Sequence, residues 1–113
     1  MKKVEAIIRP EKFQDLREKL SAIGFDGLTV TEAAGTGKQK GKIGIYRSTE
    51  FEVTLLSKLK VELVISDERL DDIVGHIIDT CKTGQIGDGK IFISPIEQVI
   101  RIRTGESGTK AIY

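Results

Sequence analysis

The sequence predicts one α+β domain of the ferredoxin-like type, in which two helices cover one face of an antiparallel sheet. Three observations support this. Alternating apolar residues mark four strands, apolar residues spaced by three and four mark two helices, and both halves of the chain follow the order strand, helix, strand. The 113 residues suit a single domain, 1–113, somewhat below the common domain size.

The first half begins with a strand, because apolar and polar residues alternate over residues 4–9. Pro10 suits the first turn of a helix, where its missing N–H has no partner to lose. The expected helix ends at Gly24 and carries an apolar stripe made of Phe13, Leu16, Leu20 and Ile23. Renewed alternation from Phe25 to Glu32 predicts the second strand, most clearly from Leu28 onward.

The second half repeats this plan. A third strand is expected over Leu59–Ile65, and Ser66 suits the N-cap of the helix that follows. The apolar stripe of this helix, which closes near Gly84, consists of Leu70, Ile73, Val74, Ile77, Ile78 and Cys81. Residues 90–96, KIFISPI, predict the fourth strand, and VIRIR at 99–103 suggests a short fifth.

The sheet face opposite the helices is expected to carry Ile7, Val64 and Phe92 together with Glu62. A half-apolar open face indicates self-association. Scattered apolar residues on a solvated face fit the same pattern equally well.

Composition excludes several classes of protein. With 39% hydrophobic and 31% charged residues the chain is typical of soluble domains, and no apolar run approaches the ~18 residues of a membrane span. The apolar stretch near the N-terminus is broken by Glu5 and Arg9, so it does not resemble a signal peptide. The single cysteine, Cys81, suits a reducing compartment, and a net charge of +1 gives no general attraction to nucleic acid or membranes. We therefore expect a cytoplasmic protein.

One segment, from about Gly35 to Glu50, has no steady period and contains four glycines. It carries four basic residues before its first acid, namely Lys38, Lys40, Lys42 and Arg47. Loops of this length are usually functional or disordered, and both interpretations are open from composition alone. A second glycine–lysine cluster later in the chain favours function.

That second cluster is TGQIGDGKIFI, residues 83–93, which runs from a helix into a strand, the reverse of a Walker loop. A backbone nest can bind an anion without a helix, so Gly87–Lys90 could still hold phosphate. Arg101 and Arg103, separated by one residue, would leave the same face of an extended chain and suit a polyphosphate. We expect these features to converge with Gly35–Gln39. Taken singly, they also fit a tight turn and an edge strand with solvated charges.

The stretch TGQIGDGKIFISPIEQVIRIRTGE, together with VTEAAGTGKQKG and YRSTEF, resembles the PII nitrogen-regulatory signal-transduction proteins over the whole chain. The resemblance implies a homotrimer of ferredoxin-like subunits that senses nitrogen, carbon and energy status, with three nucleotide sites in clefts between subunits. It assigns ATP or ADP binding to Thr29, Gly35, Gly37, Lys38, Gln39, Val64, Gly87, Asp88, Gly89, Lys90, Arg101, Ile102 and Arg103, with Glu62 close to the adenine.

The resemblance also implies that 2-oxoglutarate binds through a Mg²⁺ ion held by the nucleotide phosphates. Gln39 would give the ion an oxygen ligand, Lys58 would pair with the far carboxylate, and backbone at Lys40 and Gly41 would close over the ligand. Three loops follow from the same likeness: a flexible T-loop at 36–54 as the output device, a glycine-rich nucleotide loop at 82–90, and a C-terminal loop at 101–113.

One departure from the family pattern concerns modification. Many bacterial members carry a tyrosine where this chain has Phe51, so we expect no nucleotidylylation, while phosphorylation of Ser48 or Thr49 stays open. Arg47 resembles the loop-tip arginine that plugs ammonium channels. It makes an Amt-type transporter a candidate partner, and any membrane contact would be peripheral, although a plain exposed charge fits Arg47 too.

Other classes are less well supported. An enzyme would need a nucleophile–base pair or a metal cluster, and His76 and Cys81 suit the border or core of the second helix. Nucleic-acid binding on the open sheet would need several stacking aromatics, and Phe92 is the one candidate. Within the sensor class, the alternative is a regulator of nitrogenase or of a biosynthetic enzyme that responds mainly to the ATP/ADP ratio.

Overall fold

The computed structural model describes residues 1–36, 43–46, 49–52 and 55–112, with the backbone alone for 43–46 and 49–52. The first half of the chain comprises β1 (Lys2–Ile8), η1 (Pro10–Lys12), α1 (Phe13–Ala22) and β2 (Thr29–Gly35). The second half comprises β5 (Leu56–Ile65), η2 (Asp67–Arg69), α2 (Leu70–Cys81) and β6 (Lys90–Pro95). Between the halves lie β3 (Ile43–Tyr46) and β4 (Thr49–Glu52), and η3 (Gly108–Ala111) follows the second half.

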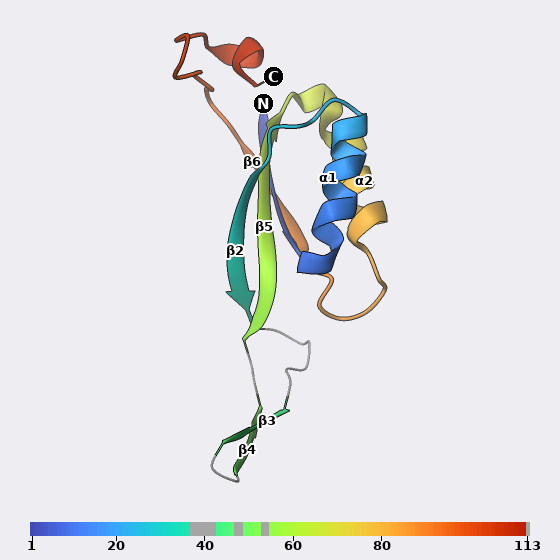
Figure 1. The fold of residues 1–113 in the computed structure, drawn as a ribbon. Coiled ribbons are helices and arrows are strands. Elements are labelled where there is room, and N and C mark those ends of the chain that lie inside the picture. Colours follow the sequence, from blue (N-terminus) through green and yellow to red (C-terminus); the bar gives the residue numbers. More distant parts are fainter. Residues whose placement is uncertain (37–42, 47–48, 53–54, 113) are drawn as a thin grey trace.

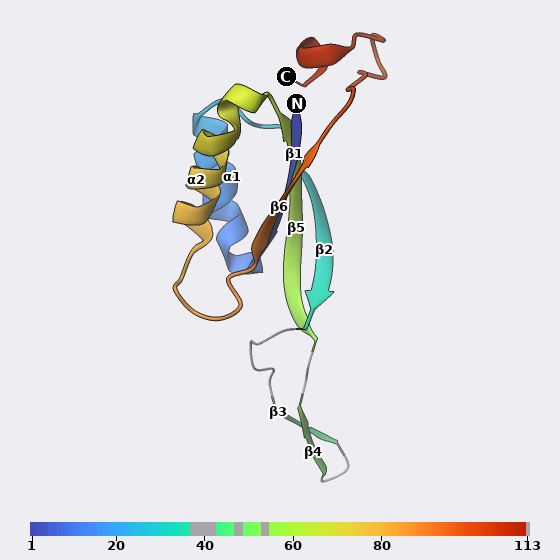
Figure 2. The same ribbon diagram turned by 180° about the vertical axis from the view of Figure 1, so that it is seen from behind.

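The main sheet has the strand order β2-β5-β1-β6, with each neighbouring pair antiparallel. Figures 1 and 2 show both helices on the same face of this sheet. The predicted ferredoxin-like fold is thus confirmed. Because β1 is central, Ile7 pairs with Lys60 on one side and Lys90 on the other.

The core lies between the sheet and the helices, as the two apolar periods predicted. Buried side chains come from alternate positions of the central strands and from one stripe of each helix. They are Val4, Ala6, Ile8, Val61, Leu63, Ile65, Leu16, Leu20, Ile73, Ile77 and Cys81, with Phe25 beside them. No helix within the described residues is long and apolar enough to cross a membrane.

The second strand begins later than predicted, at Thr29 rather than Phe25, and runs on to Gly35. Phe25 instead completes the end of α1: Gly24 has φ +95°, its N–H donates to Ser21 O, and the N–H of Phe25 donates to Leu20 O at 2.8 Å. This is a Schellman motif, in which the residue after the glycine packs back against the helix. The apolar character of Phe25 therefore reflects a helix cap.

The prediction of a fifth strand at residues 99–103 is wrong. In this segment Gly105 N–H donates to Arg101 O at 2.7 Å, and Arg101 N–H donates to Glu106 O at 2.8 Å. The chain turns back on itself there, with an isolated bridge between Ile100 and Ser107. Arg101 and Arg103 consequently do not share one face of an extended strand. Local turn bonds closed by Gly105, at φ +73°, satisfy the backbone instead of a sheet edge.

Two short strands, β3 and β4, lie in the long segment between β2 and β5. β3 and β4 pair antiparallel, with Ile43 opposite Glu52 and Tyr46 opposite Thr49. Figure 1 shows the pair beyond the end of the main sheet at which β2 stops and β5 starts.

The open sheet face carries the expected apolar residues among charged ones. Ile7 and Val64 are half-buried, and Phe92 is 53% exposed. Lys3 lies 2.7 Å from Glu5 and 3.4 Å from Glu62, whose carboxylate also contacts Lys60 at 3.2 Å. Among the described residues of this face Phe92 is the one aromatic.

Candidate functional site

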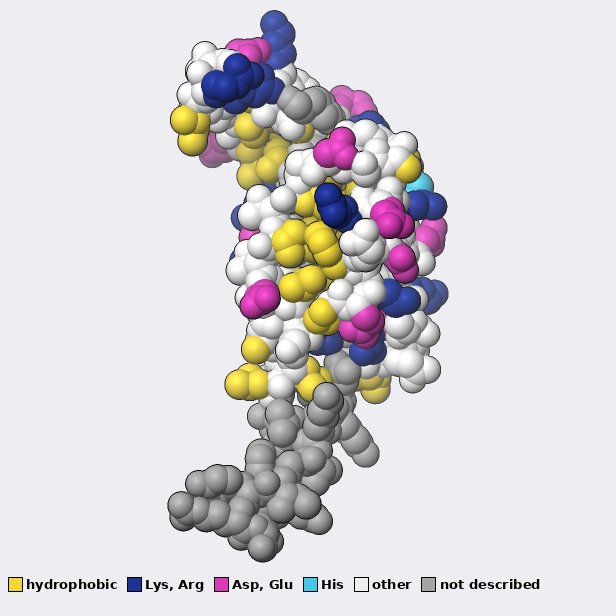
Figure 3. Space-filling model, viewed as in Figure 1, with side chains coloured by type: hydrophobic (Ala, Val, Ile, Leu, Met, Phe, Trp, Pro, Cys, Tyr) yellow, Lys and Arg dark blue, Asp and Glu magenta, His cyan; other side chains and the backbone are white. Residues whose placement is uncertain are grey.

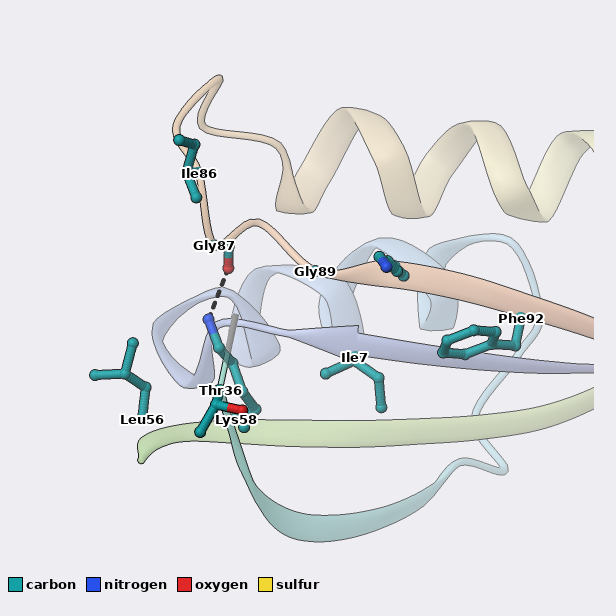
Figure 4. Close-up of a pocket in the computed structure, with 10 residues that line it drawn as sticks. Ile7, Thr36, Leu56, Lys58, Ile86, Gly87, Gly89 and Phe92 are labelled. Atoms are coloured by element: carbon teal, nitrogen blue, oxygen red, sulfur yellow. Dashed lines mark hydrogen bonds between the residues drawn. The ribbon is translucent and has the colours of Figure 1, made fainter. Parts of the chain in front are cut away.

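A cleft of about 540 Å³ opens at the end of the sheet where β2 stops and β6 starts. Its volume falls within the range of small-molecule sites. The sequence-predicted residues Gly35, Lys58, Gly87, Gly89 and Lys90 line it, which brings strand ends and the glycine-rich loop together (Figure 4). The other lining residues are Ile7, Thr36, Leu56, Ile86 and Phe92.

The glycine loop, defined here as residues 82–90, depends on backbone that only glycine adopts easily. Gly84, Gly87 and Gly89 have φ of +85°, +106° and +98°. At Gly89 the backbone presses against the central strand, because a Cβ there would lie 1.7 Å from Ile7 O. The loop therefore packs directly against Ile7, which lines the cleft.

Lys58 reaches from β5 into the cleft. Its Nζ donates to Gly87 O at 2.7 Å, as the dashed line in Figure 4 shows. Burial and the neighbouring Arg9 cation lower the pKa of the Lys58 ammonium below its ordinary value. The cleft therefore holds a partly desolvated positive charge beside the glycine loop.

Asp88, in contrast, does not line the cleft. Its carboxylate accepts the hydroxyl of Thr83, the backbone N–H groups of Thr83 and Gly84 at 2.9 Å each, and Arg9 Nε at 3.2 Å. The hydroxyl and N–H of Thr83, the N–H of Gly84 and the Arg9 guanidinium together hold the Asp88 pKa far below its usual range. The side chain thus organises the loop internally.

We expect Asp88→Asn to lower the melting temperature by a few degrees at pH 7. Because the Asp88 pKa is depressed in the folded state, its stabilisation is complete above the ordinary carboxyl range and is lost as the pH falls below about 4. The difference in melting temperature between wild type and variant should therefore shrink on acidification. Thermal unfolding at pH 7 and at lower pH measures it, with the exposed Asp79→Asn as control. A difference independent of pH would contradict this assignment.

The remaining predicted residues that the structure describes lie at the other end of the sheet. Lys58 and Val64 are six positions apart along β5, about 20 Å in an extended strand. Thr29 pairs with Glu62 at that end, and the segment that holds residues 101–103 follows β6 beyond it (Figure 1). Figure 3 shows basic side chains gathered on this C-terminal segment. The expected convergence of Arg101 and Arg103 with the glycine loop is therefore wrong within one chain.

Thr29, Glu62, Val64 and residues 101–103 are called the distal group below. Two of its members, Glu62 and Arg101, already have partners in the same chain. Lys60 and then Lys3 lower the Glu62 pKa below its ordinary value. Arg101 contacts Glu106 at 2.9 Å and donates through Nη2 to Lys110 O at 2.9 Å. Ile102 is fully exposed at 100%. The distal group thus presents a charged and partly apolar surface.

Several predicted residues lie outside the described part of the chain: Gly37, Lys38, Gln39, Lys40, Gly41, Arg47 and Ser48. The side chains of Thr49 and Phe51 fall outside it as well. Their proposed contacts stay predictions.

Sequence reasoning missed Arg9 as well as the other lining residues. Ile7 and Phe92 were assigned to an open sheet face, and the cleft uses that same face at its end. Nothing local to Arg9 indicates its partner, because Asp88 lies 79 residues further along. Such a pairing follows only from the sheet order, which places the end of β1 beside the start of β6.

The charges of the cleft suit an anion. Its lining residues include two lysines, Lys58 and Lys90, and no acid. In the described part of the chain no group of three His, Cys, Asp or Glu side chains could hold a metal ion. The described lining of the cleft thus offers no carboxylate ligand to a metal ion.

His76 and Cys81 do not form a nucleophile–base pair. Cys81 is buried, and burial raises the pKa of its thiol to about 11. His76 Nε2 lies 3.2 Å from Asp72 on the partly exposed side of α2. Both occupy the core or its border, as predicted.

Comparison with known proteins agrees with the fold. Residues 1–106 match the family model described as Nitrogen regulatory protein P-II. A protein named Nitrogen regulatory protein P-II from Nostoc punctiforme is 55% identical over 112 residues, covering 99% of this chain and 100% of that protein. Its namesake from Pasteurella multocida is 53% identical with the same coverage, and Nitrogen regulatory protein P-II 2 from Methanothermobacter thermautotrophicus is 50% identical over 112 residues, or 97% of its length. The chain therefore belongs to the P-II family of nitrogen regulatory proteins, which act as signalling regulators of nitrogen metabolism.

Proposed function

We propose that this protein senses nitrogen, carbon and energy status by binding ATP or ADP and, together with MgATP, 2-oxoglutarate. The observation that carries the proposal is the cleft in which Lys58, Lys90 and the glycine loop meet. Two cations and closely approaching backbone suit phosphate groups, and the apolar Ile7 and Phe92 nearby suit a flat ring. Membership of the nitrogen regulatory family supports the proposed role as a sensor.

We place each site between two copies of the chain in a homotrimer. The residues that line the cleft and the residues of the distal group lie at opposite ends of one sheet. They therefore cannot line one pocket within a single subunit. A head-to-tail contact that closes into a ring would bring the cleft of one copy beside Thr29, Glu62, Val64 and residues 101–103 of the next. The half-apolar open face would be covered in the same assembly.

For 2-oxoglutarate we assign the roles that the family resemblance implies. Gln39 would hold a Mg²⁺ ion together with the nucleotide phosphates, and the ion would supply coordination positions for the 2-oxo acid. Lys58 would pair with the far carboxylate, and backbone at Lys40 and Gly41 would close the site. The lowered pKa of Lys58 supports this role, because a partly desolvated ammonium gains more from an anionic partner.

The output would be the T-loop, residues 36–54. We propose that ligands in the cleft bias its conformation and that Arg47 contacts an Amt-type ammonium transporter or another nitrogen-metabolism target. Moving a two-state loop from mostly one state to mostly the other needs about 5 kcal/mol of differential binding. A metal contact and a lysine–carboxylate pair together can supply energy of that order. We propose further that the protein works in the cytoplasm and regulates without catalysis.

Calorimetric titration with MgATP, followed by 2-oxoglutarate, tests the proposal. We expect 2-oxoglutarate to bind only when MgATP is present. Gln39→Ala should retain most MgATP binding and lose 2-oxoglutarate binding by tenfold or more, about the value of one lost metal or charged contact. Gln14→Ala, on the exposed face of α1, is the matched control and should behave as wild type.

The outcomes separate the candidates. Nucleotide binding without 2-oxoglutarate binding would support the alternative, a regulator that responds mainly to the ATP/ADP ratio. A protein that binds neither would overturn the nucleotide proposal, and the glycine loop would then be a structural turn.

A further inference from the structure

Arg9 lies directly after β1, and its side chain contacts the glycine loop at two points. Nε lies 3.2 Å from Asp88 Oδ1, and Nη2 donates to Ile86 O at 3.0 Å. The Arg9 side chain is 14% exposed and does not line the cleft. Because a guanidinium is a rigid planar fork, two contacts made together fix its position and that of the loop.

Asp88 extends this contact to the beginning of the loop. The carboxylate that contacts Arg9 also accepts the N–H groups of Thr83 and Gly84. One residue further on, the hydroxyl of Thr83 accepts the N–H of Gln85 at 3.1 Å. The end of β1 is therefore connected to both sides of the loop through a single carboxylate.

Two successive carbonyl groups of the loop are held by different cations. Ile86 O accepts from Arg9, and Gly87 O accepts from Lys58 at 2.7 Å. In a planar trans peptide the N–H is antiparallel to the C=O, so each bond also sets the direction of the next N–H. The Gly87 N–H therefore points away from Arg9 and the Asp88 N–H points away from Lys58, and both directions are set before any ligand arrives. A backbone N–H held in this way can donate to an anion.

We infer that Arg9 is a positioning residue for the nucleotide site: through Asp88 and Ile86 it holds the glycine loop in the conformation that accepts phosphate. This inference rests on the proposed nucleotide binding and adds to it a residue that does not touch the ligand. Lys58 holds the same loop from inside the cleft, and Arg9 holds it from outside. Removal of Arg9 deletes no residue that lines the cleft, but it removes the preorganisation of the glycine loop.

The test combines two readouts on Arg9→Gln, Arg9→Lys and the exposed control Arg17→Gln of α1. Hydrogen–deuterium exchange of the free protein reports whether the amides of residues 84–89 are held. Titration with MgATP reports whether that matters for binding. In Arg9→Gln we expect exchange of these amides to rise and the MgATP dissociation constant to rise, each about tenfold, the value of one lost charged hydrogen-bond pair.

Arg9→Lys should lie between wild type and Arg9→Gln, because an ammonium lacks the planar fork needed to hold Asp88 and Ile86 together. If Arg9→Gln does not fold, Arg9→Lys supplies the same two readouts. Unchanged exchange, or faster exchange with wild-type MgATP affinity, would overturn the inference. A wild-type protein that binds no MgATP would overturn the proposed function, and the exchange rates would still decide separately whether Arg9 holds the loop.

Discussion

Replacing Gly89 by alanine is expected to destabilise the protein by about 3 kcal/mol and to weaken MgATP binding by more than tenfold. The new Cβ would lie 1.7 Å from Ile7 O and 2.8 Å from Ile7 C, and alanine at φ +98° is itself strained. Ile7 cannot move away, because β1 is paired on both sides. The glycine loop must therefore shift out of the cleft. Thermal unfolding and calorimetric titration measure the two effects.

Gly27→Ala is the matched control for this substitution. Gly27 has no positive φ, and an added Cβ would meet nothing within 4 Å. Its stability should stay within about 1 kcal/mol of wild type, and its MgATP affinity should not change. If Gly89→Ala had the same melting temperature as Gly27→Ala and bound MgATP normally, the close approach of Gly89 to Ile7 O would be contradicted.

Lys58→Met is expected to weaken 2-oxoglutarate binding by about thirtyfold or more, with a smaller loss in MgATP affinity. The variant removes the cation proposed to pair with the far carboxylate, a contact of about 2–3 kcal/mol when partly desolvated. It also frees Gly87 O from its 2.7 Å partner, which accounts for the smaller loss. Calorimetry with MgATP present measures both constants.

The pH dependence of this binding gives a second check on Lys58. Its pKa is lowered in the free protein, so wild-type 2-oxoglutarate affinity should fall as the pH rises toward the Lys58 pKa. Lys58→Met should lose this alkaline dependence, and Lys19→Met, exposed on α1, should retain it. Equal 2-oxoglutarate binding by Lys58→Met and wild type would exclude the assigned role.

The parts of the fold that periodicity predicted are those in which burial decides the conformation. Alternate residues of β1 and β5 and one stripe of each helix form the core, so their two periods follow directly from burial. The pattern failed where local bonds decide. Phe25 follows the pattern of a strand but belongs to a helix cap, and Arg101 follows it but lies in a turn closed by Gly105. The conformation of such segments is decided by individual hydrogen bonds, which cannot be predicted from the pattern of apolar residues.

The sequence predicted which residue types form the candidate site, but it did not predict where each side chain points. Glycine and lysine in GDGK indicated an anion loop, and Gly87, Gly89 and Lys90 do line the cleft. Asp88 was grouped with them because it lies between two glycines, yet its carboxylate serves Thr83, Gly84 and Arg9. The direction of the Asp88 carboxylate depends on Arg9, which follows the end of β1. The spacing of residues along the sequence does not reveal this contact.

The division of the predicted binding residues between the two ends of the sheet has a genetic consequence. In the proposed ring, each site takes its glycine loop from one subunit and its arginines from the neighbour. A chain damaged at Gly89 and a chain damaged at Arg103 would each assemble three defective sites when alone. Mixed in one ring, they would form one junction where an intact loop meets an intact arginine segment. Two inactive alleles of this protein should therefore complement each other partially when they are expressed together.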